Sequence, residues 1–240
     1  MSMRRAILLL VATAVAVGLS GCQSPAASDL FDVVILNGRV MDPETELDAV
    51  RNVGIRDGMI VTITEATISG ADTIDARDHV VAPGFIDTHN HAAGNAWGAK
   101  VGLRDGVTTP MDLELGTLNV DAWYADRNGR WPVNYGAAAS HEFHRMQVLD
   151  AMVMDGPKDG GDFGALRNAS YEENDVPDWA VTRASLDQLN TMIGNIDEDL
   201  RQGALGIAST TGYMANGITT LELFNVQRAA ANYGRVYASH

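Results

Sequence analysis

VVAPGFIDTHNH, residues 80–91, is the stretch of sequence that decides the fold. It begins as an apolar run, broken at Pro83 and Gly84, and ends in polar residues around two histidines. An apolar run of this length with polar ends predicts a buried β-strand. Side chains alternate along a strand, so we expect His89 and His91 to face the same way. Two imidazoles on one face would be a pair of ligands for zinc or another first-row metal.

Three later stretches extend this pattern: DGVTT at 105–109, GALGIAS at 203–209 and VYASH at 236–240. Together with VAPGFIDTHNH they resemble the amidohydrolase superfamily, and in particular its N-acyl-D-amino-acid deacylase (D-aminoacylase) branch. The resemblance covers residues 31–240. It implies a metal-dependent hydrolase of linear amide C–N bonds with a small-molecule amide as substrate. It also implies one or two bound divalent ions, with zinc the expected metal.

Composition limits the possible partners. The chain has 240 residues, 46% of them hydrophobic, which is enough for a substantial core. The formal net charge is −14 and the sequence pI is about 4.6. These values argue against nucleic acid as a partner, because such binding needs a basic surface. A single cysteine excludes an intrachain disulfide.

That cysteine, Cys22, ends a segment typical of a bacterial lipoprotein signal. Residues 1–5 carry two arginines, residues 6–18 are apolar but short for a membrane span, and LSGC follows at 19–22. We therefore predict a signal peptide at 1–21 and a tether at 22–30. Lipid on Cys22 would anchor the protein to the bacterial cell envelope without a chain crossing the membrane. A plain secretory signal with an incidental cysteine is the alternative.

Residues 31–79 predict a small antiparallel β module. Asn37-Gly38 and Asp57-Gly58 each lie between apolar runs, and both dipeptides are strong hairpin signals. The module resembles half of the β-sandwich that precedes the barrel in the amidohydrolase superfamily.

Residues 80–240 predict strands that alternate with helices, which is typical of parallel βα units. Strands are expected at 107–115, 133–139, 204–209 and 236–239, after the first at 80–86. Helices are expected at 121–128, after a capping box at Ser185 and Gln188, and after Thr219. The polar, glycine-rich segment 150–178 predicts a long loop, either an active-site lid or a variable surface loop.

The predicted fold class is therefore α/β, a partial TIM (β/α)8 barrel with about five of eight strands after a small β-sandwich-like module. A barrel short of three strands cannot close. We thus expect the chain to be the N-terminal part of a longer protein, inactive on its own. The resemblance places an Asp for proton transfer on the eighth strand, beyond His240.

Four polar side chains sit at the predicted C-terminal ends of strands, where TIM barrels carry their active sites: His89, His91, Glu114 and His240. The resemblance gives His240 the place of a metal ligand. It also places a cysteine ligand where this chain has Leu115, and the adjacent Glu114 can supply an anionic oxygen instead. Pairing of Glu114 with an arginine is the alternative, and Asp112 is the next candidate ligand.

Substrate-side residues follow from the resemblance alone. SHEFHR at 140–145 resembles a Gly-His-x-x-x-Arg stretch of the branch, which suggests His141 and Arg145 as substrate contacts. His141 could instead be a hydrogen-bond partner behind the ligands. Tyr213, after the fourth strand, is a further candidate, with packing as its alternative role. The two remaining histidines, His79 and His144, are expected on the surface.

Two other functions remain open. The missing cysteine suggests a lipid-anchored, non-catalytic binding protein on a decayed amidohydrolase scaffold. Another amidohydrolase chemistry, such as that of a deaminase, is also possible. Branches that bridge two metals with a lysine on strand four, the dihydroorotase and hydantoinase types, are disfavoured because Lys100 and Lys158 are the only lysines and both lie elsewhere.

Overall fold

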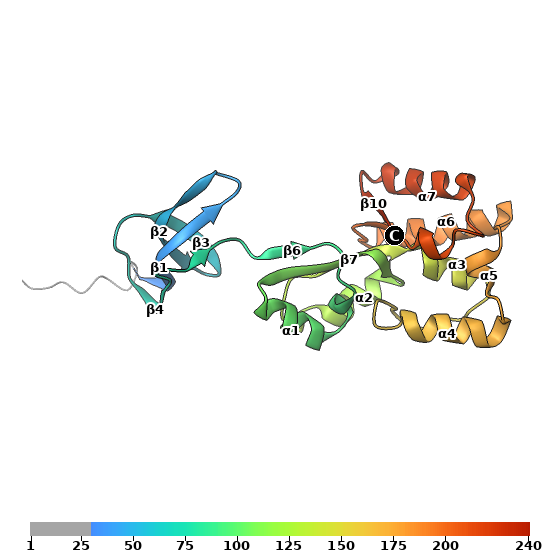
Figure 1. Ribbon diagram of the computed structural model, residues 1–240, viewed down its shortest axis with the longest axis horizontal. Helices are drawn as coiled ribbons and strands as arrows, with labels where there is room; N and C mark the ends of the chain where they lie inside the picture. Colours follow the sequence, from blue (N-terminus) through green and yellow to red (C-terminus); the bar gives the residue numbers. More distant parts are fainter. Residues whose placement is uncertain (1–29) are drawn as a thin grey trace, which may run out of the picture. The chain divides into compact units, whose positions relative to one another are not determined.

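The computed structural model describes residues 30–240, which divide into two compact units at Pro83 and Gly84 (Figure 1). The predicted signal peptide and Cys22 lie outside the described residues. Within residues 30–240, no helix combines the length and the apolar character that a membrane crossing requires.

The first unit is a five-stranded mixed sheet. Its central path runs β3 (Met59–Thr64), β2 (Leu47–Arg56), β1 (Phe31–Asp42), β4 (Gly70–Asp75), and β5 (Val80–Val81) also pairs with β1. The pairs β1–β2 and β2–β3 are antiparallel, whereas β4 and β5 run parallel to β1. The expected β module is present, but it is not purely antiparallel.

One of its two predicted hairpins is correct. Asp57 and Gly58, with φ of 52° and 74°, connect β2 to β3, as a primed turn requires. The hairpin at Asn37-Gly38 is wrong, because both residues lie inside β1 at a bulge. There Asn37 has φ 64°, and its side chain donates a hydrogen bond to Asp75 Oδ1 (3.1 Å). Asparagine tolerates this conformation in a bulge as well as in a turn, so the dipeptide alone does not distinguish them.

The deciding stretch 80–91 is not one buried strand. Residues 80–81 form β5 in the first unit, and β6 (Phe85–Asp87) belongs to the second. Pro83 lies between the two strands, so its lack of an N–H group costs neither strand a hydrogen bond. Phe85 and Ile86 are two-thirds exposed because β6 is an edge strand. The predicted buried strand is therefore wrong in extent and in burial.

The second unit contains the predicted half barrel. Its sheet has the order β10-β9-β8-β7-β6, with β7 (Val107–Thr117), β8 (Gly136–Ser140), β9 (Gly206–Ser209) and β10 (Val236–Ser239). Every neighbouring pair is parallel, and the spatial order follows the chain order. This arrangement confirms a partial TIM barrel of five strands.

Helices connect and cover these strands: α1 (Ala96–Arg104), α2 (Val120–Arg127), α3 (His141–Leu149), α4 (Phe163–Asn174), α5 (Asp178–Val181), α6 (Leu186–Arg201) and α7 (Thr220–Asn232). The capping box of α6 is confirmed: the Ser185 hydroxyl accepts from the Gln188 N–H, and Gln188 Oε1 accepts from the Ser185 N–H. The apolar stripe of α6 packs with α7 and the barrel strands into the main core, through Leu189, Met192, Ile196, Leu200, Ile207 and Val226.

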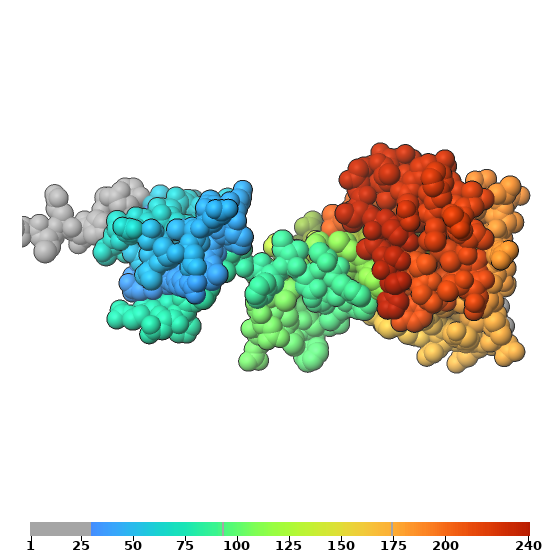
Figure 2. Space-filling model, turned by 45° about the horizontal axis from the view of Figure 1, so that its top comes forward, coloured from blue at the N-terminus to red at the C-terminus, as the bar shows by residue number. Residues whose placement is uncertain are grey.

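Segment 150–178 is not a featureless loop, because it contains α4. Phe163 and Leu166 of this helix pack against a second core that includes Phe143, Met146 and Trp179. Glycines and acidic residues around the helix hide its short apolar stripe, which is why composition alone suggests a loop. Figure 2 shows the surface of this segment in yellow and orange on the second unit. The helix matters for the site, since it delivers two of the residues that line the cavity described below.

Candidate metal centre

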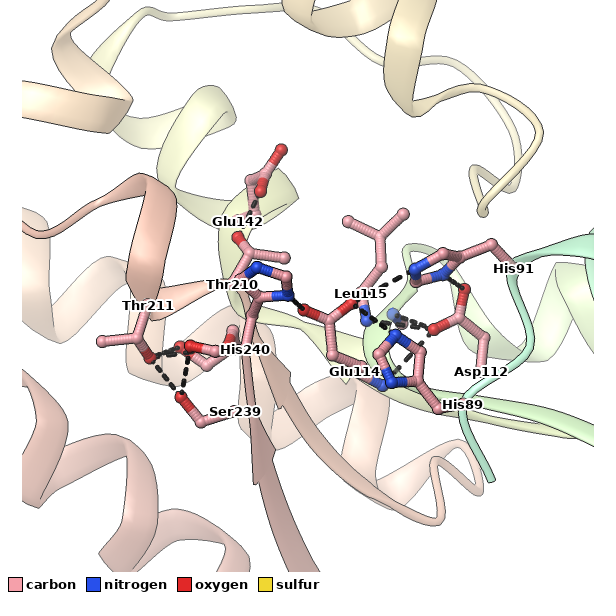
Figure 3. Close-up of polar contacts among 12 residues, drawn as sticks. His89, His91, Asp112, Glu114, Leu115, Glu142, Thr210, Thr211, Ser239 and His240 are labelled. Carbon is pink, nitrogen blue, oxygen red and sulfur yellow. Dashed lines mark hydrogen bonds and ion pairs between the residues drawn. The ribbon is translucent and has the colours of Figure 1, made fainter. Parts of the chain in front are cut away.

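Three potential ligands meet at the C-terminal ends of the first two barrel strands (Figure 3). Glu114 lies on β7, while His89 and His91 follow β6. Oε2 of Glu114 is 3.5 Å from Nε2 of His89 and 3.3 Å from Nε2 of His91. The donor atoms of the three residues all lie within 4.8 Å of one another. The two imidazole rings have an edge-to-face arrangement, with centroids 5.0 Å apart.

These donors suit a divalent ion such as zinc. Bonds of about 2.0–2.1 Å in a tetrahedral site would put neighbouring ligand atoms roughly 3.3 Å apart. The observed separations between Glu114 and the two histidines match that spacing. The other oxygen of Glu114, Oε1, is buried and has no hydrogen-bond partner. A buried carboxylate oxygen left without a donor is costly, and a cation nearby would remove that cost.

Asp112 fixes the orientation of His91. Its Oδ2 lies 2.9 Å from His91 Nδ1, and this hydrogen bond is the main reason that the pKa of His91 is raised. A proton on Nδ1 leaves Nε2, which faces Glu114, as the nitrogen with a free lone pair. The other oxygen, Oδ1, accepts hydrogen bonds from the backbone N–H groups of three following residues, Glu114, Leu115 and Gly116.

Asp112 therefore stands behind the ligands rather than among them. The three backbone hydrogen bonds tighten the end of β7, where Gly116 has a φ of 79°. This tight turn leaves Glu114 facing the histidines while Leu115 is buried in the second core. The contacts of Glu114 within the described residues are to histidines, so pairing with an arginine is not observed.

His240 approaches the same carboxylate from the other side. Its Nδ1 is 2.8 Å from Glu114 Oε1, although the orientation is not that of a hydrogen bond. Its ring stacks on Tyr213 with centroids 4.8 Å apart, and its backbone N–H donates to the carbonyl of Ser209. The structure thus brings together all four residues predicted as ligands. The two oxygens of Glu114 face different histidines (Figure 3).

A cavity of about 140 Å³ opens beside these residues. It is lined by His91, Glu114, Leu115, Phe163, Arg167, Thr210, Tyr213 and His240. Tyr213, predicted as a substrate contact, belongs to this lining, and its role stays a prediction. Arg167 and Phe163 were not found from the sequence because they lie on α4, inside the predicted loop. Their spacing of four residues, which places both on one helix face, was the available signal.

His141 and Arg145 do not line the cavity. Both side chains are fully buried on α3, in a network around Glu222 of α7. His141 Nε2 is 2.9 Å from Glu222 Oε1, and its Nδ1 is 2.9 Å from the Ser209 hydroxyl. Arg145 pairs with Glu222 and donates to the carbonyls of Trp179 and Thr182, at 2.7 Å each. In this arrangement neither residue is open to a substrate.

Burial sets the charge states in this network. Loss of water lowers the pKa of His141, even though Glu222 acts in the opposite direction. Burial alone would raise the pKa of Glu222, but His141 and Arg145 outweigh it and lower that pKa. The network therefore contains a neutral imidazole beside an ion pair.

The two histidines expected on the surface behave differently. His144 is 3% exposed, and its Nε2 lies 2.8 Å from Asp199 on α6, so the surface prediction is wrong for this residue. It lies on α3, a helix that was not among those expected from the sequence. His79 in the first unit is exposed, as predicted.

Two curated relatives are similar to parts of the chain, whereas no protein-family model matches it. A dihydroorotase from Streptococcus pneumoniae is 53% identical over 60 residues, or 25% of this chain and 14% of the relative. An allantoinase from Escherichia coli is 26% identical over 167 residues, or 62% of this chain and 36% of the relative. The chain thus spans a minor part of the length of either relative.

A solved structure matches over most of the chain. The N-acyl-D-glutamate deacylase from Bordetella bronchiseptica, complexed with zinc and a phosphonate inhibitor, has a TM-score of 0.66 at 23% sequence identity. The match covers 88% of this chain and 45% of the deacylase. At this identity, the likeness shows a shared fold. The chain therefore has the fold of the D-aminoacylases, and parts of its sequence are similar to a dihydroorotase and an allantoinase.

Proposed function

We propose that the protein hydrolyses linear amide C–N bonds with the help of a bound divalent metal, and that N-acyl-D-amino acids are its substrate class. The observation that carries this proposal is the convergence of His89, His91 and Glu114 on one point, beside a cavity. The deacylase of similar fold was crystallised with zinc and with a mimic of the tetrahedral intermediate of its reaction. That complex supports the reaction class without defining the substrate here.

The roles of the chain's own residues follow from the geometry. His89 and His91 would hold the ion through their Nε2 atoms, and Glu114 through a carboxylate oxygen. Asp112 would keep the proton of His91 on Nδ1. A bound divalent ion would lower the pKa of a water molecule to about 7 and would polarise a carbonyl oxygen. Tyr213, at the wall of the cavity, would contact a bound amide, and His240, stacked on it, would be a further metal ligand beside Glu114.

The choice of a linear over a cyclic amide depends on an absent lysine. Both curated relatives described above belong to branches that act on cyclic amides, which the superfamily resemblance associates with a lysine on the fourth strand. In this chain β9 reads Gly-Ile-Ala-Ser at 206–209 and contains no lysine. Lys158 lies beside β7, where its backbone pairs with Leu118, and Lys100 lies on α1. This difference favours the linear amides.

A non-catalytic binding protein is the second candidate, and Leu115 is the observation that favours it. Leu115 stands at the position where the D-aminoacylase branch carries a cysteine ligand, and its side chain is buried in an apolar core. A scaffold that had lost metal chemistry could tolerate such a residue. The adjacent Glu114, turned toward the histidines, makes the hydrolase the better supported proposal.

Metal analysis combined with a substrate screen tests the proposal. The chain would be loaded with zinc, dialysed and measured for bound metal, and the longer protein expected from the sequence would be measured for hydrolysis of N-acyl-D-amino acids, their L-isomers and cyclic amides. We expect bound zinc that depends on His89, and hydrolysis confined to the linear amides. His79→Asn is the matched control, since His79 is an exposed histidine of the first unit. Zinc content equal in wild type and His89→Asn would contradict the metal centre.

We also propose that the mature protein is held at the bacterial cell envelope by lipid on Cys22. The support is the arrangement of residues 1–22, namely two arginines, an apolar segment and Leu-Ser-Gly before the cysteine. Mass spectrometry of the protein from a bacterial host should find an acylated peptide that begins at Cys22. Cys22→Ala should abolish this peptide, and an unmodified Cys22 in the wild type would exclude the anchor.

A further inference from the structure

The cavity beside the metal centre contains a permanent positive charge. Among its described lining residues, Arg167 is the only lysine or arginine. An arginine side chain keeps its proton at any relevant pH, so this charge is constant. The chain as a whole is acidic, with 31 Asp and Glu against 17 Lys and Arg. A cation placed in the cavity is therefore a local exception to the charge of the protein.

Arg167 is held in one orientation by a buried carboxylate. Its Nε and Nη2 donate to Oε1 and Oε2 of Glu142, at 2.7 Å each. Glu142 is fully buried and also accepts a hydrogen bond from the Thr210 hydroxyl. A guanidinium offers five N–H donors in a planar fork, and Glu142 uses the edge with Nε. Among the described residues, Glu142 is the only carboxylate that pairs with this guanidinium.

Aromatic rings hold the plane of the same guanidinium. Arg167 lies over the ring of Tyr213 at 4.2 Å and near the ring of Phe163 at 5.1 Å. Tyr213 in turn stacks on His240, and Phe163 lies 6.2 Å from the ring of His91. Two series of ring contacts therefore link Arg167 to the candidate metal centre. One runs through Tyr213 to His240, and the other runs through Phe163 to His91. A cation fixed in this way loses little conformational entropy when a ligand binds.

We propose that Arg167 binds the carboxylate of the substrate, so that the cavity selects acyl amino acids with a free carboxylate over neutral amides of the same shape. The planar fork of arginine matches a carboxylate, and charge-assisted hydrogen bonds of this kind are the strong ones. This inference rests on the proposed function, since it names the group of the substrate that points away from the metal. If Arg167 served only to neutralise Glu142, the protein would show no such preference.

Calorimetric titration of the zinc-loaded chain tests the selection directly. The two probes are N-acetyl-D-alanine and N-acetyl-D-alaninamide, which differ in the charge of one group. We expect wild type to bind the acid about 10- to 100-fold more tightly than the amide. In Arg167→Met this ratio should fall to about threefold or less, and Arg167→Lys should keep part of it. Arg228→Met, which removes an exposed arginine on α7, should keep the wild-type ratio.

A second variant separates binding from folding. Arg167→Met leaves Glu142 buried without its partner, whereas Arg167→Met combined with Glu142→Gln removes both charges. The double variant should fold and should also lack the preference for the acid. A preference that survives in the folded double variant would overturn the proposal, because the metal alone could then account for it. If the longer protein expected from the sequence hydrolysed no amide but kept an Arg167-dependent preference, the carboxylate site would be supported and the hydrolase refuted.

Discussion

Two histidine–carboxylate clusters lie in the same half barrel, and they differ in what their atoms lack. In the first, His89 and His91 are partly open to solvent, whereas Glu114 is buried and has a carboxylate oxygen without a hydrogen bond. In the second, His141, Arg145 and Glu222 are fully buried, and both nitrogens of the imidazole are hydrogen-bonded, although Oε2 of Glu222 also lacks a hydrogen bond. The same residue types form a candidate metal site in the first cluster and a buried ion-pair network between α3 and α7 in the second.

The difference shows that residue type and strand position do not identify a ligand by themselves. His141 follows β8 directly, as His89 follows β6, and both positions suggest a role at the active end of the barrel. His141 instead begins α3 and turns inward to Glu222. What separates the clusters is the state of the imidazole nitrogens, since a metal ion can bind only to a ring nitrogen that lacks a hydrogen-bond partner. Among the described residues Nε2 of His89 and of His91 makes no hydrogen bond, whereas both ring nitrogens of His141 do. Four predictions test this distinction.

The largest expected effect is on stability, in the buried cluster of His141, Arg145 and Glu222, called here the closed cluster. Arg145→Met would leave Glu222 buried without its cationic partner, and breaking a buried ion pair in this way costs about 3–5 kcal/mol. Urea denaturation should show this loss in the free energy of unfolding, with zinc binding unaffected. Arg130→Met is the control, because Arg130 is an exposed arginine with an exposed partner, and it should leave the urea midpoint unchanged. A loss below about 1 kcal/mol in Arg145→Met would contradict the interpretation that this buried ion pair stabilises the fold.

The matching change in the cluster of His89, His91 and Glu114, called here the open cluster, should affect metal affinity instead. Glu114→Gln keeps the shape of the side chain but removes the charge that faces His89 and His91. Loss of a ligand should exceed the roughly 10- to 100-fold effect of residues behind the ligands, so we expect zinc affinity to fall more than 100-fold. Competition with a chromophoric chelator measures it. Unchanged zinc affinity would show that Glu114 is not a ligand.

Asp112→Asn tests the support of the open cluster. The amide can still accept from the backbone N–H groups, but it no longer offers His91 a negatively charged acceptor. Zinc affinity should fall by about 10- to 100-fold. Asp72→Asn, an exposed change in the first unit, provides the charge-matched control. If Asp112→Asn weakened zinc as much as Glu114→Gln does, Asp112 would itself be a ligand.

The smallest effect concerns pH and the closed cluster. The pKa of His141 lies below its ordinary value of 6.5 because the imidazole is buried. As pH falls below 6.5, His141 takes up a proton in the unfolded chain but not in the native protein. The free energy of unfolding therefore decreases. The lowered pKa of Glu222 adds a second loss as pH falls below its ordinary value of 4.5.

Zinc-free protein would be used for this measurement, so that metal release does not contribute. His141→Gln should remove the loss that begins near pH 6.5 and keep the one at lower pH. Denaturation midpoints across pH 4–8 measure both. A midpoint independent of pH between 7 and 5 in wild type would mean that His141 titrates normally.

The parts of the fold that were predictable depend on local signals. Strand β10 at 236–239, the capping box at Ser185 and the hairpin at Asp57-Gly58 each follow from a few neighbouring residues, and all three are present. The order of the parallel strands was predictable as well, because right-handed βα units add neighbours in sequence. Helix α4 was missed, because its short apolar stripe lies in a glycine-rich segment and is stabilised by tertiary packing.

The four residues predicted as ligands lie together because strand ends converge in a barrel, so their meeting does not depend on details of the loops. The roles of Asp112 and Arg167 could not be predicted. Asp112 precedes Glu114 by two residues, and only the tight end of β7 turns it toward His91. Arg167 depends on contact with Glu142, which is 25 residues away in sequence. Such long-range pairs leave no pattern in a single sequence.

The turn at the end of β7 also defines a short signature, Asp-x-Glu-x-Gly at 112–116. The Asp gathers three backbone N–H groups, the Glu turns toward the histidines, and the Gly supplies a φ of 79°. A Cβ atom on Gly116 would come within 2.6 Å of the carbonyl oxygen of Ala138, so no other residue fits. Superfamily members that lack the cysteine but carry this five-residue pattern should form a subgroup with an all-oxygen-and-nitrogen metal site. Cobalt-loaded members of that subgroup should lack the thiolate-to-metal absorption band that a cysteine ligand would give.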